Sequence, residues 1–175
     1  MKAAEFKEIG FFADVLSAKM LSETMLADWD KGGRNLNKIS HDSAIGLIKK
    51  VRDELGFKVS RVYLDTVGSP QKYKIIIEQA LADSSIQVVV ESKADDTYPV
   101  VSAASICAKV TRDHALNDYV YPEVGREFSR TVGCGYPGDK ITVGWLNDHR
   151  DPVFGWPSIV RFSWKTCYEK LDKDN

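Results

Sequence analysis

The sequence has little cysteine, and its three cysteines stand far apart. Cys107, Cys134 and Cys167 are odd in number and form no Cys-x-x-Cys pair. Such a pattern argues against a disulfide framework and against a zinc site. The simplest interpretation is a protein of a reducing, intracellular compartment.

Long hydrophobic runs and a surplus of basic residues are also absent. No segment reaches the ~20 apolar residues of a membrane-spanning helix, and residues 1–9 are charged and unlike a signal peptide. The 24 Lys and Arg residues are matched by 25 Asp and Glu, a formal net charge of -1. Free-standing nucleic-acid binders usually carry a basic excess. Any basic surface must therefore be local, and the net charge neither proves nor excludes a nucleic-acid partner.

The residues that are present predict an α/β protein. Over 175 positions the chain is 43% hydrophobic and 28% charged, as in a soluble globular protein. Periodicity and turn residues predict strands at 9–16, 59–64 and 86–91, and helices at 40–55, 70–81, 100–120, 142–149 and 158–171. Ser69 is expected to cap the helix that starts at Pro70. We expect an α/β core over residues 1–121 and a loop-rich, helical segment over 122–175. Three strands are few for such a sheet.

Asp65 is the first candidate for chemistry, because it ends the strand predicted before it. An acid at the carboxyl end of a buried strand points into the crevice where α/β proteins bind ligands. The alternative is a turn residue that accepts hydrogen bonds from nearby backbone. Spacing alone favours this structural alternative.

Lys109 and Asp113 lie four residues apart on one face of the predicted long helix. Their simplest interpretation is a solvated ion pair. Here the acid follows the base, which is the weaker orientation, so helix stability explains the pair less well. Spacing alone still favours the ion pair over a functional site.

The segment from Gly133 to Gly138 has the G-x-G-x-x-G spacing of dinucleotide-binding loops. That fingerprint needs a preceding strand and a following helix within a βαβ unit. Here Pro137 interrupts the loop and residues 127–132 are a poor strand, so we reject a nicotinamide-dependent enzyme. Tyr136 in this loop either stacks on a sugar or base or packs within its own loop.

Longer segments of the sequence, taken in order, match one known family. They are Asn35-Leu36-Asn37, Ser40-His41-Asp42, residues 62–68 (VYLDTVG), Lys93-Ala94-Asp95, residues 98–110 (YPVVSAASICAKV) with Arg112-Asp113, Gly135-Tyr136-Pro137, residues 152–157 (PVFGWP) and 160–164 (VRFSW). Together they resemble the catalytic A subunit of eukaryotic type 2 ribonuclease H. The resemblance covers nearly the whole chain, and the run from Tyr98 to Asp113 is its most specific part.

The resemblance implies a ribonuclease H-like fold and a nuclease of DNA replication and repair in the nucleus. Such enzymes hydrolyse the RNA strand of RNA–DNA hybrids and cut at ribonucleotides embedded in duplex DNA. They use four carboxylates and two Mg²⁺ (or Mn²⁺) ions, roughly 3.5–4 Å apart. By resemblance Asp65 matches the third carboxylate and Asp113 the fourth, and Tyr136 matches a tyrosine at the RNA–DNA junction. Lys93 and Lys109 are expected to face phosphates. Two accessory subunits are the implied partners.

The sequence departs from the family at its start. The family's first two carboxylates form an Asp-Glu pair in a glycine-rich segment on the first, central strand, and no such segment occurs here. The usual C-terminal extension also ends early, at Asn175. The resemblance thus implies a fold that lacks its central strand, which agrees with the small number of strands.

Asp65 and Asp113 alone offer two negative charges to ions that together carry four positive ones. We therefore expect weak metal binding and no cleavage by this chain alone. Either the chain is part of a nuclease whose start is absent, or it is a short non-catalytic module that binds hybrids or partner subunits.

Overall fold

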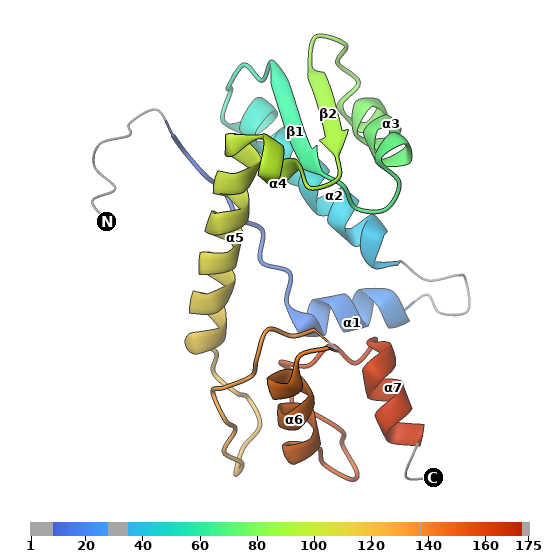
Figure 1. Cartoon of the computed structure of the whole chain (residues 1–175), viewed down its shortest axis with the longest axis vertical. Helices are drawn as coiled ribbons and strands as arrows, with labels where there is room; N and C mark the ends of the chain where they lie inside the picture. Colours follow the sequence, from blue (N-terminus) through green and yellow to red (C-terminus); the bar gives the residue numbers. More distant parts are fainter. Residues whose placement is uncertain (1–8, 28–34, 137, 173–175) are drawn as a thin grey trace. The chain divides into compact units, whose positions relative to one another are not determined.

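The computed structural model describes residues 9–27, 35–136 and 138–172 (Figure 1). The chain forms two compact units. Residues 1–15 and 35–113 belong to the first, and residues 16–34 and 114–175 to the second. From the sequence, a boundary was instead expected after residue 121, with residues 16–34 in the core. Below, each unit is described by itself.

The first unit alternates helices and strands, as the sequence predicts. Its elements are α2 (Leu36–Lys49), a π-helical turn η2 (Lys50–Glu54), β1 (Arg61–Asp65), α3 (Pro70–Leu81), β2 (Gln87–Glu91), α4 (Ala94–Thr97) and most of α5 (Pro99–Asn117), up to residue 113. Ser69 caps α3 by accepting a hydrogen bond from the Lys72 amide, and Pro70 opens the helix. Both features were predicted from the sequence.

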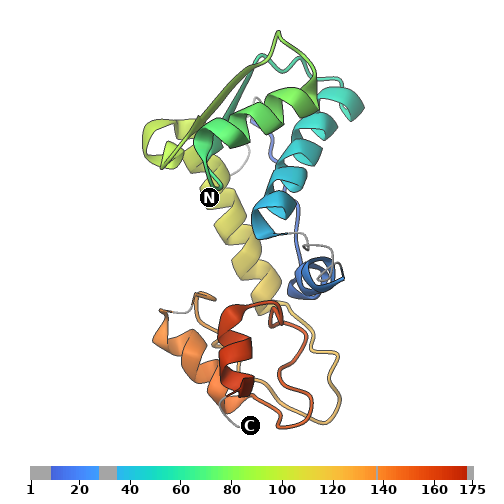
Figure 2. The same cartoon turned by 90° about the vertical axis from the view of Figure 1, so that its right-hand side faces the viewer.

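The sheet of this unit consists of β1 and β2, which pair in parallel with Asp65 opposite Glu91. Helices α2 and α3 cover one face of it (Figures 1 and 2). Alternate strand residues and both helices supply the core. Its buried residues are Tyr73, Ile77, Leu81, Ile86 and Val88, with Ile45, Ile48, Val62, Leu64 and Val90 among those packed against them. Because the strands end at the same edge, this packing fixes the position of any site at their carboxyl ends.

Three sequence predictions for the first unit are corrected by the structure. Residues 9–17 form no strand: the apolar side chains of Ile9 and Phe11 are 72% and 66% exposed, since no neighbouring strand pairs with them. Helix α2 begins at Leu36 rather than Ser40, because the Asn35 side chain accepts a hydrogen bond from the Lys38 amide and so caps it earlier. The expected loop at 93–99 contains α4.

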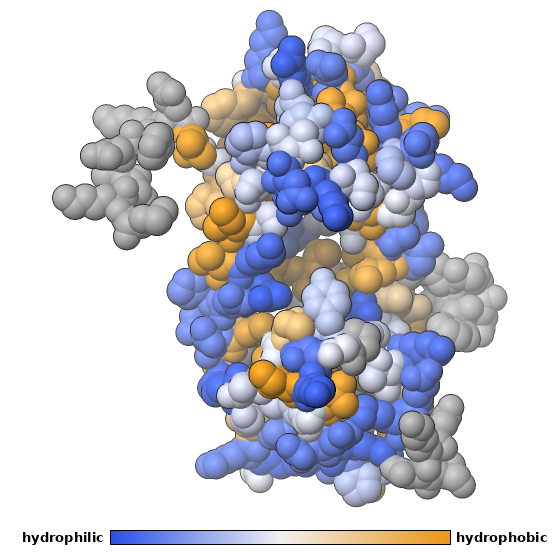
Figure 3. All heavy atoms as spheres, in the orientation of Figure 1, coloured by the Kyte–Doolittle hydropathy of each residue, from blue (hydrophilic) through white to orange (hydrophobic). Residues whose placement is uncertain are grey.

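Helix α5 is the longest helix of the unit and leaves part of its apolar surface open. Val100, Ile106 and Val110 are 60%, 59% and 49% exposed, and Figure 3 shows hydrophobic side chains at the surface over this helix. Even so, no helix in the described ranges has the length and apolar character needed to cross a membrane.

The second unit is helical and loop-rich. It contains α1 (Ala18–Leu26), α6 (Lys140–Asp148) and α7 (Lys165–Asp172), so the segment predicted as helical from 158 becomes helical only at Lys165. The Phe162 amide donates to the buried Ser22 hydroxyl at 2.9 Å and thereby joins α1 to this unit. Its core residues are Trp145, Leu146, Trp156, Val160 and Cys167.

Candidate metal site and nucleic-acid interface

Asp65 is the last residue of β1, and among the described residues only one of its two carboxylate oxygens accepts hydrogen bonds. Oδ1 accepts hydrogen bonds from the Thr66 amide at 3.0 Å and the Ala94 amide at 3.3 Å. Among the described residues, Oδ2 has no hydrogen-bond partner. The backbone contacts expected of a turn residue are therefore present, while one exposed oxygen remains available for a cation.

The Ala94 contact brings a second acidic residue toward Asp65. After β2 the chain turns sharply at Lys93, which has a left-handed backbone (φ 57). Helix α4 then starts at Ala94, which is 1% exposed, and packs against β1. Asp95 follows Ala94 in the first turn of α4 and is partly exposed. Asp95 thus lies one residue from a group bonded to Asp65.

The sequence did not single out Asp95, because the resemblance assigned the fourth carboxylate to Asp113. The usable signal was present in the Lys93-Ala94-Asp95 motif of the resemblance. What the sequence did not reveal was the hydrogen bond that draws this motif to the end of β1.

Asp113, the other predicted carboxylate, has a different environment. It lies fourteen residues after Pro99 in α5, about 21 Å along the helix axis at the usual rise, and Figures 1 and 2 show α5 running away from the sheet. Its side chain is 58% exposed and pairs with Arg112, 2.6 Å from Nη2. Among the described residues, no hydrogen bond or ion pair joins Asp113 to Asp65.

A third acid at the sheet edge, Glu91, holds Tyr98 with one of its carboxylate oxygens. It lies opposite Asp65 in the register, and its Oε1 accepts a hydrogen bond from the Tyr98 hydroxyl at 2.8 Å. That bond raises the pKa of Tyr98. The Tyr98 ring packs on Tyr63, with centroids 4.6 Å apart. These contacts fix the start of α5 beside β1.

His41 supports the turn that follows Asp65. Its Nε2 lies 3.0 Å from the Val67 carbonyl oxygen, so Nε2 carries the proton and donates. The ring stacks on Tyr73 at 4.0 Å. His41 thus supports this turn.

The donor set suits a divalent cation that prefers oxygen, since Asp65 and Asp95 both provide carboxylate oxygens. No cluster of three or more His, Cys, Asp or Glu able to hold a metal is found in the described part of the chain.

The residues predicted to contact nucleic acid are all exposed. In the first unit, Lys93 is exposed beside α4 and Lys109 is exposed on α5. In the second unit, Tyr136 is 70% exposed in the loop before α6. Pro137, its neighbour in the predicted motif, lies outside the described residues.

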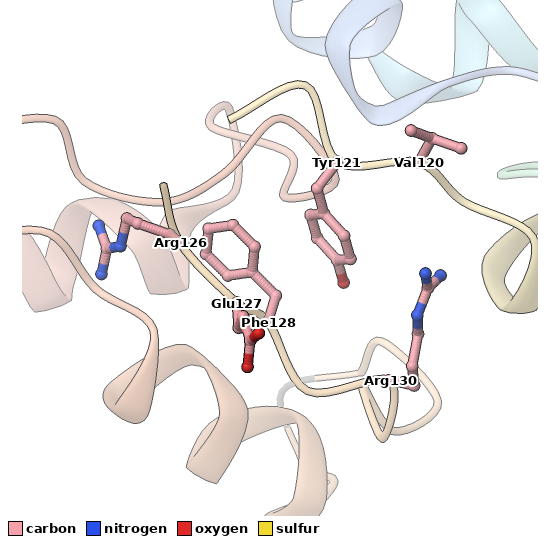
Figure 4. A pocket seen from close by; sticks show the side chains of 6 residues that line it. All are labelled: Val120, Tyr121, Arg126, Glu127, Phe128 and Arg130. Atoms are coloured by element: carbon pink, nitrogen blue, oxygen red, sulfur yellow. The ribbon is translucent and has the colours of Figure 1, made fainter. Parts of the chain in front are cut away.

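A hollow of about 360 Å³ in the second unit contains none of these predicted residues. Its lining consists of Val120, Tyr121, Arg126, Glu127, Phe128 and Arg130 (Figure 4). Both guanidinium groups are engaged: Arg126 pairs with Asp151 at 2.8 Å, and Arg130 donates to the Asn117 and Tyr119 carbonyls. We assign it no function.

Comparison with known proteins then decides the family. The family model described as ribonuclease HII matches residues 7–167. The chain belongs to this family. It is 50% identical over 165 residues to the A subunit of ribonuclease H2 from Arabidopsis thaliana, covering 94% of this chain and 54% of that protein. It is 45% identical over 166 residues to the Homo sapiens protein of the same name, covering 95% and 54%. The chain thus spans about half the length of these relatives.

A solved structure supports the fold. The chain resembles a structure titled as the PCNA:RNase HII complex from Archaeoglobus fulgidus, with a TM-score of 0.57 and 26% identity over 86% of this chain and 64% of that one. The expected α/β, ribonuclease H-like fold is therefore confirmed, with the sheet reduced to two parallel strands among the described residues. Its family membership identifies the chain as a ribonuclease H type 2 sequence.

Proposed function

We propose that this chain is part of a divalent-metal endoribonuclease that hydrolyses the RNA strand of RNA–DNA hybrids and cuts at ribonucleotides embedded in duplex DNA. The observation that carries the proposal is the hydrogen bond from the Ala94 amide to Asp65, which brings Asp95 to the end of β1. Membership of the ribonuclease HII family supports the reaction class.

We further propose that Asp65 and Asp95 hold Mg²⁺ or Mn²⁺, with Asp95 taking the place first given to Asp113. Bound divalent ions would activate water and stabilise the leaving oxygen of a phosphodiester. The protein's own part is to fix the ligands. The Thr66 and Ala94 amides orient one Asp65 oxygen, which would leave the other to bind the cation.

Nucleic-acid contact is assigned to three exposed side chains. Lys93 and Lys109 are proposed to face phosphates, because an ammonium group on a flexible stem suits them. Tyr136 is proposed to pack on the sugar or base at the RNA–DNA junction. Accessory subunits are the proposed partners, since the relatives are named as one subunit of ribonuclease H2, and a role in the nucleus in replication and repair belongs to the same proposal.

Activity of this chain alone is not part of the proposal. Two carboxylates offset only half of the positive charge of two divalent ions, so metal binding should be weak. We expect no metal-dependent cleavage of an RNA–DNA hybrid by the 175-residue protein. Robust cutting by the purified chain would show that two carboxylates are sufficient.

A longer chain tests the nuclease assignment itself. The 175-residue sequence is fused after a glycine-rich strand that carries an Asp-Glu pair. Cleavage of a labelled RNA–DNA hybrid in Mg²⁺ is then followed on a gel. We expect cutting, and its loss in Asp65→Asn and Asp95→Asn with an unchanged melting temperature. Binding of the hybrid without cutting would instead favour a non-catalytic binding module.

A further inference from the structure

The loop that carries Tyr136 is held by two side chains at the start of α6. Asp139 Oδ2 accepts a hydrogen bond from the Cys134 amide at 2.8 Å, and Thr142 Oγ1 accepts one from the Gly135 amide at 2.9 Å. The Asp139 amide in turn donates to the Tyr136 carbonyl at 3.0 Å. The backbone is thus held on both sides of Tyr136.

Asp139 and Thr142 also hold each other. The Thr142 hydroxyl lies 2.8 Å from Asp139 Oδ2 and 3.1 Å from the Val132 carbonyl, so its one proton serves these two acceptors. Thr142 is 5% exposed. The Cys134 amide and the Thr142 hydroxyl are the first causes of a lowered Asp139 pKa, so this residue stays ionised at neutral pH. The network is therefore charged and partly withdrawn from water.

Gly133 leaves the space that this network fills. A Cβ at Gly133 would lie 2.3 Å from Asp139 Oδ2 and 2.7 Å from the Thr142 amide nitrogen, and φ is +73. Only glycine permits both the backbone conformation and this close approach. The loop cannot take this form with another residue at the position.

The Tyr136 side chain contrasts with the backbone that carries it. The backbone is fixed by at least three hydrogen bonds, while the side chain is 70% exposed. A rigid backbone under an exposed aromatic ring lowers the entropy cost of stacking, because the binding conformation is already populated.

We propose that Asp139 and Thr142 are positioning residues that act through Tyr136. They hold the 133–136 loop so that Tyr136 already has its binding conformation before nucleic acid binds. The inference rests on the proposed function, because it needs Tyr136 to contact the hybrid. Neither Asp139 nor Thr142 touches the nucleic acid in this account.

A double-mutant cycle tests the inference with the whole 175-residue chain. The dissociation constant for a fluorescein-labelled RNA–DNA hybrid is measured by anisotropy in Ca²⁺ for the wild type, Thr142→Val, Tyr136→Ala and the double variant. We expect Thr142→Val to weaken binding about fivefold, since it removes the hydroxyl that accepts a hydrogen bond from the Gly135 amide of the loop. We expect Tyr136→Ala to weaken binding about tenfold or more. In the Tyr136→Ala background the Thr142→Val effect should disappear.

Rescue and matched controls separate positioning from general destabilisation. Thr142→Ser keeps the hydroxyl and should bind within about twofold of the wild type. Tyr168→Ala alters another exposed tyrosine of the same unit and should leave the dissociation constant unchanged. If Thr142→Val unfolds the unit, Asp139→Asn replaces it in the same cycle.

The outcomes distinguish this inference from the function on which it rests. Thr142→Val could raise the dissociation constant by the same factor in both backgrounds while Tyr136→Ala still weakens binding. That result overturns the positioning role and leaves the nuclease proposal intact. If the wild-type chain does not bind the hybrid at all, the nucleic-acid role of Tyr136 is wrong, and the inference is wrong with it.

Discussion

The backbone amide of Ala94 donates to the Asp65 carboxylate across 29 positions of sequence. This bond joins the end of β1 to the start of α4, where Asp95 follows Ala94. Ala94 is 1% exposed, so its small side chain sets how closely α4 approaches β1.

Enlarging Ala94 should therefore separate α4 from β1. We expect Ala94→Leu to lower the free energy of unfolding by about 1–3 kcal/mol, the usual cost of overpacking a filled site. Urea denaturation followed by circular dichroism measures the change. Ala104→Leu is the control, because Ala104 is exposed on α5 and has room for a larger side chain. Equal effects of the two substitutions would contradict the packing described for α4.

The stabilisation by Asp139 should depend on pH in a definite direction. The pKa of Asp139 in the folded chain is lowered, first by the Cys134 amide, and an unfolded aspartate titrates near pH ~3.9. Its contribution is therefore complete above that value and is lost as the pH falls through the lowered folded pKa.

Urea denaturation of the wild type and Asp139→Asn at several pH values tests this dependence. We expect a constant stability gap between about pH 7 and 5 that narrows below about pH 4. Asp118→Asn, at an exposed position, is the control. A gap that widens on acidification would show that the carboxylate is not held by these donors.

Cys134 and Cys167 should react in an order set by burial. Cys167 is 1% exposed and burial raises its pKa to about 11, whereas Cys134 is exposed. At pH 8 only about one Cys167 thiol in a thousand would be ionised, and the thiolate is the reactive form. Mass spectrometry after brief iodoacetamide treatment should find Cys134 alkylated and Cys167 unmodified. Guanidinium chloride should remove the difference, and early labelling of Cys167 would contradict the described core.

Much of the first unit could be predicted from the sequence, because its signals are local. The Ser69 cap, Pro70 at the start of α3 and the valine-rich β2 all act through neighbouring residues. The strand predicted at 9–16 is wrong for the opposite reason. An apolar composition supplies a strand only when another strand accepts its backbone hydrogen bonds, and the structure pairs only β1 with β2 among the described residues.

The candidate site depends on a long-range contact for a similar reason. Strand position alone favoured a turn role for Asp65, and only the resemblance named it as a carboxylate of the site. The hydrogen bond that draws residues 94 and 95 toward it is one that no periodicity encodes. Asp95 and Asp113 both occur in motifs of the resemblance. The hydrogen bond to the Ala94 amide and the length of α5 are three-dimensional facts, and they favour Asp95.

The most direct test of the account is Mn²⁺ binding to the chain, measured by paramagnetic broadening of backbone amide signals. We expect Mn²⁺ to broaden the Thr66 and Ala94 amides first, and Asp65→Asn and Asp95→Asn each to abolish that broadening. Asp113→Asn should leave it unchanged, since this carboxylate pairs with Arg112 in α5. Broadening that survives Asp95→Asn but is lost in Asp113→Asn would contradict the Asp65–Asp95 site.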